Sequence, residues 1–306
     1  MRGFLGEQLA IVAWSVTALV IAYSRLGQAV PEVRVTYRYA WNLAHGHGLV
    51  GEAGERVFGV ADPGVALLLG WLHWVSRVDP ARIGTFLTAA WLLGTARVLL
   101  RAAARDGRRL EGVLGGTLIV TSPLLWQAQG SGALAGLAFL LTAAARGERW
   151  PTSAGLSAGL AVWMRPDAAP AAALLGGLLT LTRRRLPRRY TLAAGLVVLA
   201  GCVAAWSWFG TAWPAALFAR RATALQWGPP AVALAVLGLA GLPWLWRRIG
   251  LPGRVLLLHA AVTAGTYALL GQPLSTGSAP AVAALLFAAP FAPLALARRS
   301  ARIGRS

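Results

Sequence analysis

The chain alternates long apolar runs with short polar stretches, and the apolar runs repeatedly approach the length that crosses a bilayer. Several are short and rich in glycine, which lets neighbouring helices pack closely. The pattern predicts an all-α polytopic membrane protein with about ten transmembrane helices. The predicted helices are Leu9 to Tyr23, Ala81 to Leu99, Gly112 to Trp126, Ala133 to Ala145, Ser153 to Met164, Ala169 to Thr182, Thr191 to Phe209, Pro230 to Trp246, Val255 to Leu270 and Pro280 to Ala297.

The first apolar run, Leu9 to Tyr23, has two interpretations. With one Arg before it and Glu7 among its flanking residues, it resembles a weak signal peptide as well as a first helix. Its apolar run is at the long end for a signal peptide, and the rest of the chain stays in the membrane. We therefore expect a retained helix.

One further run, Gly64 to Val75, decides the orientation of everything after it. It is shorter than a bilayer requires and contains His73. If it does not cross, the Arg clusters of the later loops all fall on the cytoplasmic side, as the positive-inside rule favours. We expect an interfacial or re-entrant helix on the outer face, with both termini cytoplasmic. The clusters are Arg101 to Arg109, Arg146 to Arg149, Arg183 to Arg189, Arg247 to Arg254 and Arg298 to Arg305.

Composition agrees with a membrane protein. Of 306 residues, 57% are hydrophobic and 13% are charged, and the mean hydropathy is +0.60. All 29 basic residues are Arg, and the net charge of +19 would suit nucleic acid if the Arg clusters did not lie between apolar runs. The single Cys202 excludes an intrachain disulfide and a cysteine-cluster metal site. No HExxH or CxxC spacing supports a local metal motif.

The polar segment from Val35 to Pro63, after the first span, is the first place to look for function, because loops between spans are otherwise short. In the favoured topology, residues Arg25 to Pro80 form one large outer loop that contains this segment. Within it, Val35 to Ala44 has helical spacing and carries aromatic residues and Arg38. One interpretation is an interfacial helix with aromatic anchors and snorkelling arginines; the other is a surface that meets phosphate.

Arg165 and Asp167 form a second candidate site at the outer end of a span. Ionisable groups at membrane depth are costly and are usually paired or functional, and Pro166 breaks the helix there. The alternative is a helix-end salt bridge with no further role. His73 is expected to be an interfacial filler and His259 a satisfied interhelical hydrogen bond. Trp206, Trp208 and Trp213 are typical of an outer aromatic belt.

The segment TYRYAWNLAHGHGLVGEAGERVFG (Thr36 to Gly59) resembles the segment after the first helix in GT-C glycosyltransferases of the arabinofuranosyltransferase-like branch. Weaker similarities in the same order are DPGVALLLG from Asp62, SPLLWQAQGSG from Ser122, WMRPDAAP from Trp163 and WFGTAWPAALFARR from Trp208. The resemblance implies a GT-C-like fold and inverting sugar transfer from a polyprenyl-phosphate donor.

The resemblance also implies roles for individual residues. Glu32 matches one of the family's two acids in the first outer loop and would be the base that deprotonates the acceptor hydroxyl, with Asp62 as the fallback acid. Arg38 and Arg165 would bind the departing phosphate, and His47 and Asp167 would orient sugar or Arg. The chain departs from the family pattern in one of the loop acids, in the acid of the Gly132 to Ala135 element, and in the later outer Arg-Tyr motif.

The first hypothesis is a glycosyltransferase of the bacterial inner membrane, acting outside the cytoplasm on an envelope glycan, lipid or protein. The second is a non-catalytic relative that binds lipid or a partner, and the third a lipid or solute transporter, disfavoured because no inverted repeat is present. No cofactor is implied, although two loop carboxylates would permit a divalent cation. We expect one transmembrane domain, residues 1–297, and an Arg-rich cytoplasmic tail, residues 298–306.

Overall fold

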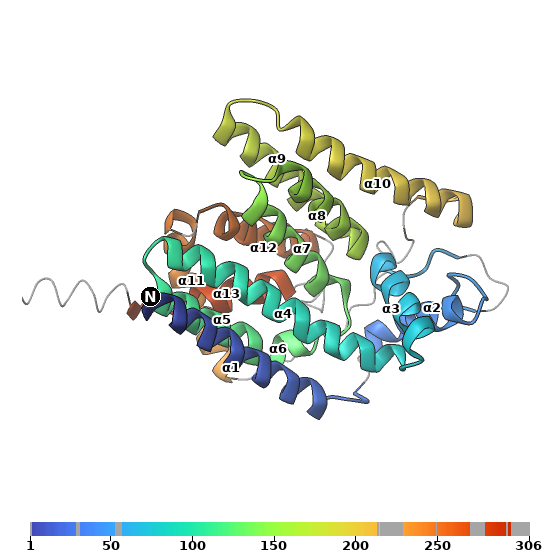
Figure 1. The fold of residues 1–306 in the computed structure, drawn as a ribbon, viewed down its shortest axis with the longest axis horizontal. Helices are drawn as coiled ribbons and strands as arrows, with labels where there is room; N and C mark the ends of the chain where they lie inside the picture. The colour runs from blue at the N-terminus through green and yellow to red at the C-terminus, as the bar shows by residue number, and fades with distance from the viewer. Residues whose placement is uncertain are drawn as a thin grey trace, which may run out of the picture.

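The computed structural model describes residues 2–28, 31–52, 57–212, 214, 229–248, 250–269, 279–291 and 293–294, and their regular structure is entirely helical. Figure 1 shows the helices stacked in a bundle with α2 and α3 at one end. Helices α1 to α6 are Arg2–Ser24, Arg34–Ala44, Pro63–Ser76, Pro80–Arg105, Arg109–Thr121 and Pro123–Trp126. Helices α7 to α13 are Gly132–Arg146, Pro151–Met164, Ala169–Arg183, Arg188–Phe209, Pro229–Arg248, Gly250–Leu269 and Ala279–Ala288, and the 3₁₀ turns η1 and η2 are Pro31–Val33 and Pro166–Ala168.

Proline and local caps set many of the helix boundaries. Helices α3, α4, α6 and α8 each begin with proline, whose missing N–H costs nothing in the first turn. The Asp79 carboxylate accepts a hydrogen bond from the Ala81 N–H at 2.8 Å and caps α4. Helix α10 ends where Gly210 adopts a left-handed conformation. These features explain why most predicted boundaries are close to the observed ones.

Two predicted spans differ most from the observed helices, while α1 and α4 are longer than expected, beginning at Arg2 and ending at Arg105. The run Gly112 to Trp126 is broken, because Ser122 is extended and Pro123 starts the separate short helix α6. The last run was expected to continue to Ala297, but α13 ends at Ala288 in a turn. The predicted Arg-rich tail, residues 298–306, lies outside the described residues.

Among the described helices, three are long and apolar enough to cross a bilayer: Leu5–Ser24 of α1, all of α4, and α10. Other apolar helices, including α3, α7 and α13, are shorter than a bilayer requires. Helices α1 and α10 lie at the outside of the bundle, where Leu9, Leu192 and Leu196 are exposed. Apolar surface of this kind fits contact with lipid.

Close packing at glycine holds the bundle together. The Trp14 ring of α1 lies over Gly116 of α5 and donates a hydrogen bond from Nε1 to Thr117 Oγ1 at 2.9 Å. Helix α8 approaches α10 in the same manner, since a Cβ atom on Gly159 would come within 2.6 Å of Val197 Cβ. Small residues at such contacts are the usual means by which helices associate in a membrane.

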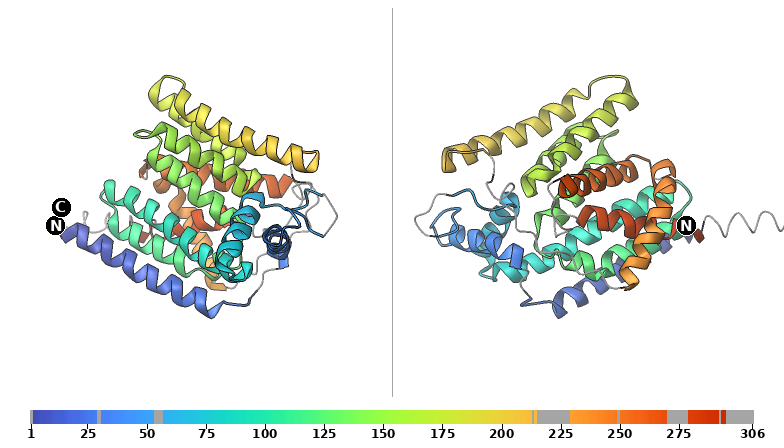
Figure 2. Two further views of the ribbon diagram at one scale, coloured as in Figure 1. Left: turned by 45° about the vertical axis from the view of Figure 1, so that its right-hand side comes forward. Right: turned by 180° about the vertical axis from the view of Figure 1, so that it is seen from behind.

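The bundle has two chemically different ends. We call the first the arginine end: it holds the start of α1 and the α4–α5, α7–α8 and α9–α10 turns (Figure 1). Arg109 pairs with Glu7 there at 3.3 Å, and Arg183 donates to the Gly147 carbonyl at 3.1 Å. The opposite end, the polar end, holds α2, α3 and η2, and both views in Figure 2 show the same division. Helix α3 packs against α2 at the polar end, where α1 ends and α4 begins.

Candidate functional site

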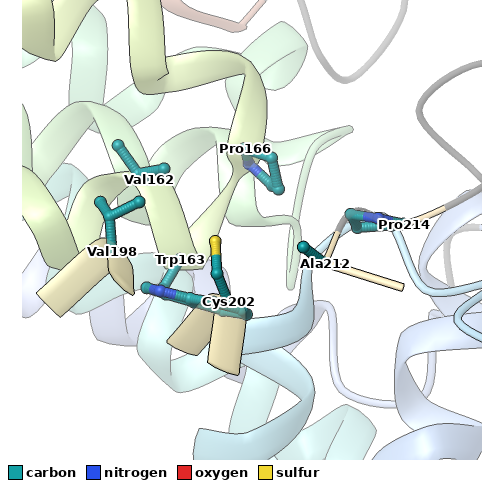
Figure 3. A pocket seen from close by; sticks show the side chains of 7 residues that line it. All are labelled: Val162, Trp163, Pro166, Val198, Cys202, Ala212 and Pro214. Atoms are coloured by element: carbon teal, nitrogen blue, oxygen red, sulfur yellow. The ribbon is translucent and has the colours of Figure 1, made fainter. Parts of the chain in front are cut away.

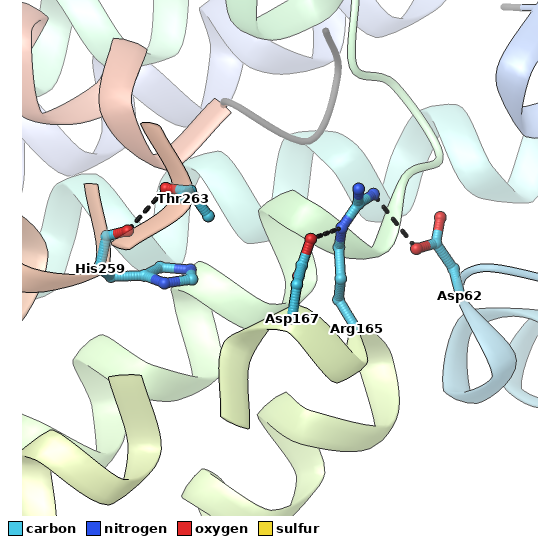
Figure 4. Close-up of polar contacts among 5 residues, drawn as sticks. All are labelled: Asp62, Arg165, Asp167, His259 and Thr263. Atoms are coloured by element: carbon cyan, nitrogen blue, oxygen red, sulfur yellow. Dashed lines mark hydrogen bonds and ion pairs between the residues drawn. The ribbon is translucent and has the colours of Figure 1, made fainter. Parts of the chain in front are cut away.

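The buried charges of the polar end meet in one cluster, Asp62, Arg165 and Asp167 (Figure 4). Arg165 donates from Nε to Asp167 Oδ2 at 2.9 Å and from Nη1 to Asp62 Oδ1 at 3.3 Å. The side chains of Arg165 and Asp62 are only 5% and 6% exposed, and that of Asp167 is 20% exposed. The predicted Arg165–Asp167 pair is therefore present, and it includes a third residue that is distant in sequence.

Local backbone breaks aim these three side chains at one another. Helix α8 ends at Met164 because Arg165 is extended, with φ −155° and ψ 112°, and Pro166 starts the turn η2. Asp62 precedes α3 as its N-cap residue, but its carboxylate makes no capping hydrogen bond and reaches Arg165 instead. Asp62 directly precedes Pro63 at the start of α3, and Asp167 directly follows Pro166 at the start of η2. Proline therefore sets the backbone direction beside each acid.

Gly132, the first residue of α7, lies directly against this cluster. A Cβ atom there would overlap the Met164 carbonyl oxygen and come within 2.8 Å of Asp62 Oδ1. Gly132 to Ala135 is the element in which the resemblance expects an acid that this chain lacks. Its backbone is nevertheless placed beside the buried charges, so that α3, α7 and α8 converge on one point.

His259 of α12 matches its expected role only in part. The imidazole was expected to make an interhelical hydrogen bond, yet His259 is 2% exposed and its Nδ1 has no partner. The close-up in Figure 4 shows the ring directed toward Asp167 from the side opposite Asp62. Its backbone carbonyl accepts a hydrogen bond from the Thr263 hydroxyl at 2.6 Å. A lone His in an apolar span was the only sequence signal for this position.

A second group of polar side chains lies near the turn between α6 and α7. Tyr37, Gln129 and Ser131 are buried, and the Tyr37 hydroxyl, Gln129 Oε1 and Ser131 Oγ have no hydrogen-bond partner. Burial, with a smaller contribution from Asp79, raises the pKa of the Tyr37 phenol, so that it stays a hydrogen-bond donor. Gly130 N donates to Thr88 Oγ1 at 2.8 Å and holds the turn against α4. Sequence analysis did not anticipate these unpartnered groups.

An apolar groove of about 460 Å³ begins next to the charged cluster and runs between α8, α10 and the outer segment. Pro63 and Met164 line it, and they directly follow Asp62 and precede Arg165 in the sequence. The other lining residues are Leu43, Leu49, Phe58, Gly64, Leu67, Leu160, Trp163, Val197, Gly201, Ala204, Ala205, Trp208 and Phe209. No lining residue carries a charge, so the groove suits a hydrocarbon chain whose polar end reaches the cluster.

Trp163 forms part of the groove wall. Its indole donates from Nε1 to the Val197 carbonyl at 3.2 Å and lies over Gly201. Figure 3 shows the same residue lining a second, much smaller pocket of about 10 Å³ with Cys202, Pro166 and Pro214. That pocket is about the size of one water molecule, so the groove is the larger apolar space beside Trp163.

Two of the remaining predicted site residues, Arg38 and His47, do not join the cluster. Arg38 is exposed and forms a 3.5 Å ion pair with Glu52, whose side chain is also exposed. His47 is exposed as well. Glu32 lies in η1, and its side chain is outside the described part of the structure. Of the described residues, no group of three His, Cys, Asp or Glu side chains stands close enough to hold a metal ion.

The other expected aromatic residues are placed as follows. His73 fills the contact between helices: its Nδ1 lies 2.7 Å from the Val78 carbonyl, and its ring is 4.9 Å from that of Trp41. Trp206 and Trp208 are exposed on α10, as an aromatic belt requires, and Trp213 lies outside the described residues. The contacts of His73 do not test its expected position at the membrane interface, and they include two ring neighbours, Trp41 and His45.

Tyr39 holds the irregular segment 57–60 that leads toward Asp62. Its hydroxyl donates to the Val57 carbonyl at 2.6 Å and accepts from the Gly59 N–H at 3.0 Å. We expect Tyr39→Phe to lower the free energy of unfolding by about 1–3 kcal/mol, because two backbone groups lose their partner. Hydrogen exchange should become faster at residues 57–60. Tyr23→Phe, at a tyrosine that is 75% exposed, is the matched control and should change neither quantity; equal effects would contradict the assignment.

The groove wall can be tested through glycine. Gly201→Ala places a methyl group where the Trp163 ring now lies, whereas Gly195 of the same helix has nothing near its Cβ position. We expect Gly201→Ala to lower the free energy of unfolding by about 1–3 kcal/mol through overpacking. Gly195→Ala should be neutral or stabilising by up to about 1 kcal/mol. Thermal unfolding in detergent measures both, and equal shifts would show that Trp163 does not pack as described.

Comparison of the chain with protein-family models, with curated proteins and with solved structures found no match.

Proposed function

We propose that the protein is a polytopic membrane glycosyltransferase that takes a sugar from a polyprenyl-phosphate donor and transfers it to an envelope glycan, lipid or protein on the extracytoplasmic side. The observation that carries the proposal is the position of the Asp62–Arg165–Asp167 cluster at the edge of the apolar groove. A polyprenyl phosphate has the matching form, since it joins an apolar chain to an anionic head. The polar end would then face the outer leaflet, with about ten helices in the membrane.

Each residue of the cluster receives a role in this proposal. The acceptor hydroxyl loses its proton to a carboxylate while its oxygen attacks the anomeric carbon of the sugar. The bond between that carbon and the phosphate oxygen breaks with inversion, and polyprenyl phosphate leaves. We assign the base to Asp62, with Glu32 as the alternative that the resemblance implies, and stabilisation of the departing phosphate to Arg165. Asp167 holds the guanidinium in place. Arg38 and His47 are outside the proposed site.

Turnover tests the proposal directly. The full-length protein, purified in lipid nanodiscs, is incubated with radiolabelled polyprenyl-phosphate pentose or hexose and an envelope-glycan acceptor. We expect label in the acceptor together with release of polyprenyl phosphate, and loss of both with Arg165→Gln. Arg82→Gln removes an exposed Arg near the start of α4 and is the control expected to keep activity. Absence of turnover with every donor would contradict enzymatic function.

A non-catalytic lipid-binding module is the second candidate. It is favoured by the wholly apolar groove lining and by the fact that both described acids of the cluster already contact Arg165. A polyprenyl phosphate with a photoreactive isoprene unit separates the two functions. Crosslinking to α8 and α10 without sugar transfer would support the binding module, whereas crosslinking with transfer supports the enzyme.

A further inference from the structure

The turn between α9 and α10, at the arginine end of the bundle, encloses a hollow of about 650 Å³. Four of its seven lining residues are arginines: Arg183, Arg185, Arg188 and Arg189. All four are exposed, and the hollow lies at the end of the bundle opposite the Asp62–Arg165 cluster. It is therefore a separate feature from the proposed transfer site.

The backbone conformation of the α9–α10 turn places these arginines around the hollow. Arg183 is anchored, because its Nη2 donates to the carbonyl oxygens of Gly147 and Glu148 in the α7–α8 turn. Arg184 follows in a left-handed conformation with φ 52°, which is unusual for a residue with a side chain and reverses the chain. Pro187 is buried and precedes α10, so that Arg188 and Arg189 face the hollow from the first turn of that helix.

The lining of the hollow holds four arginines and no acidic residue. Among the described residues, none of the ion pairs includes Arg183, Arg185, Arg188 or Arg189. Two acids near this end pair with other arginines, Glu7 with Arg109 and Glu111 with Arg108, and a third, Glu148, lies in the adjacent α7–α8 turn with an exposed side chain. Several guanidinium groups around one cavity are suited to phosphate oxygens, which they bind through pairs of parallel N–H groups.

The surface next to the hollow indicates an amphiphile. Leu181 at the end of α9 is 76% exposed, and Leu192 and Leu196 on α10 are 72% and 67% exposed. Helix α10 is long and apolar enough to span a bilayer, and Leu192 and Leu196 lie along it after the first turn that lines the hollow. A phosphate bound between the arginines would therefore carry its acyl chains along an apolar ridge that faces lipid.

We propose that the α9–α10 turn binds the headgroup of an anionic phospholipid, with the phosphate between the four arginines and the acyl chains along α10. A lipid with two phosphates is preferred over one with a single phosphate, because four guanidinium groups surround the space. The site requires only that the bundle lies in a membrane; it does not depend on sugar transfer.

Native mass spectrometry of the full-length protein in neutral detergent tests the site, with cardiolipin, phosphatidylglycerol or phosphatidylcholine added as probes. We expect retention in the order cardiolipin, phosphatidylglycerol, phosphatidylcholine. Arg185→Gln with Arg188→Gln should weaken cardiolipin retention by about tenfold or more. Arg101→Gln with Arg105→Gln removes the same charge from exposed positions at the same end and should change retention by less than about twofold.

Three results would overturn the proposal. Equal loss in the two double variants would mean that charge alone, and not the hollow, attracts the lipid. Equal retention of phosphatidylcholine would show that the headgroup is not recognised. Displacement of cardiolipin by millimolar inorganic phosphate would identify a free phosphate, and not a lipid, as the ligand. Thermal unfolding of each variant confirms that it is folded before binding is compared.

Discussion

Arg165→Met is expected to lower the free energy of unfolding by about 3–5 kcal/mol. The substitution keeps most of the side-chain volume but leaves the carboxylates of Asp62 and Asp167 without the guanidinium that both contact. Asp62 is buried, so without Arg165 its carboxylate would be an unpaired charge shielded from water, which destabilises the folded state. Unfolding in detergent, followed by heat or by a denaturant series, measures the change.

Two further variants make this prediction specific. Adding Asp62→Asn and Asp167→Asn to Arg165→Met removes the stranded charges and should recover most of the lost stability, because the three groups act as one unit. Arg82→Gln removes an exposed Arg and should stay within about 0.5 kcal/mol of the original protein. A triple variant less stable than Arg165→Met alone would show that the three side chains do not form one charged cluster.

Asp62→Asn is expected to reduce kcat/KM for sugar transfer by about 10²–10⁴-fold, the usual effect of removing a positioned base. The amide keeps the shape of the side chain and its place beside Gly132 but cannot accept the proton of the acceptor hydroxyl. The measurement uses the labelled donor assay with the nanodisc-embedded protein. Glu52→Gln, at an exposed acid of the same outer segment, is the matched control and should leave kcat/KM within about twofold.

The same assay with Glu32→Gln decides between the two acids. If Asp62 is the base, Glu32→Gln keeps most of the activity. Loss of turnover with Glu32→Gln, together with activity retained in Asp62→Asn, would transfer the role to Glu32. Unfolding temperatures separate a chemical effect from a structural one, since Asp62→Asn also removes one contact of Arg165.

Local patterns were sufficient for most of the helices. The starts of α3, α4 and α8 were predicted to within two residues, because proline at the first helical position acts without any tertiary contact. The break at Pro123 was missed because the apolar run continues through it. Hydropathy alone also could not separate helices that are long enough to span a membrane from shorter apolar helices packed within the bundle.

In the candidate site, too, local contacts were predictable from the sequence and long-range contacts were not. Arg165 and Asp167 are two residues apart, and the Pro166 break between them made their pairing predictable. Nothing local indicated that Asp62, 103 residues earlier than Arg165, would join them. Nor did the sequence indicate that Nδ1 of His259 would lack a partner. Whether a buried polar group is hydrogen-bonded depends on which donors and acceptors lie on the neighbouring helices.

From the sequence alone came an all-helical chain with apolar helices of membrane-spanning length, the polar segment after the first helix, the Arg-rich turns and the Arg165–Asp167 pair. These follow from hydropathy, proline and charge over short distances, where few conformations compete. Tertiary structure alone decided that Asp62 meets Arg165, that Gly132 lies against both, and that α8 and α10 leave an apolar groove beside them. Such contacts depend on how glycine-lined helix faces fit together across the bundle, and that fit is a property of several distant segments at once.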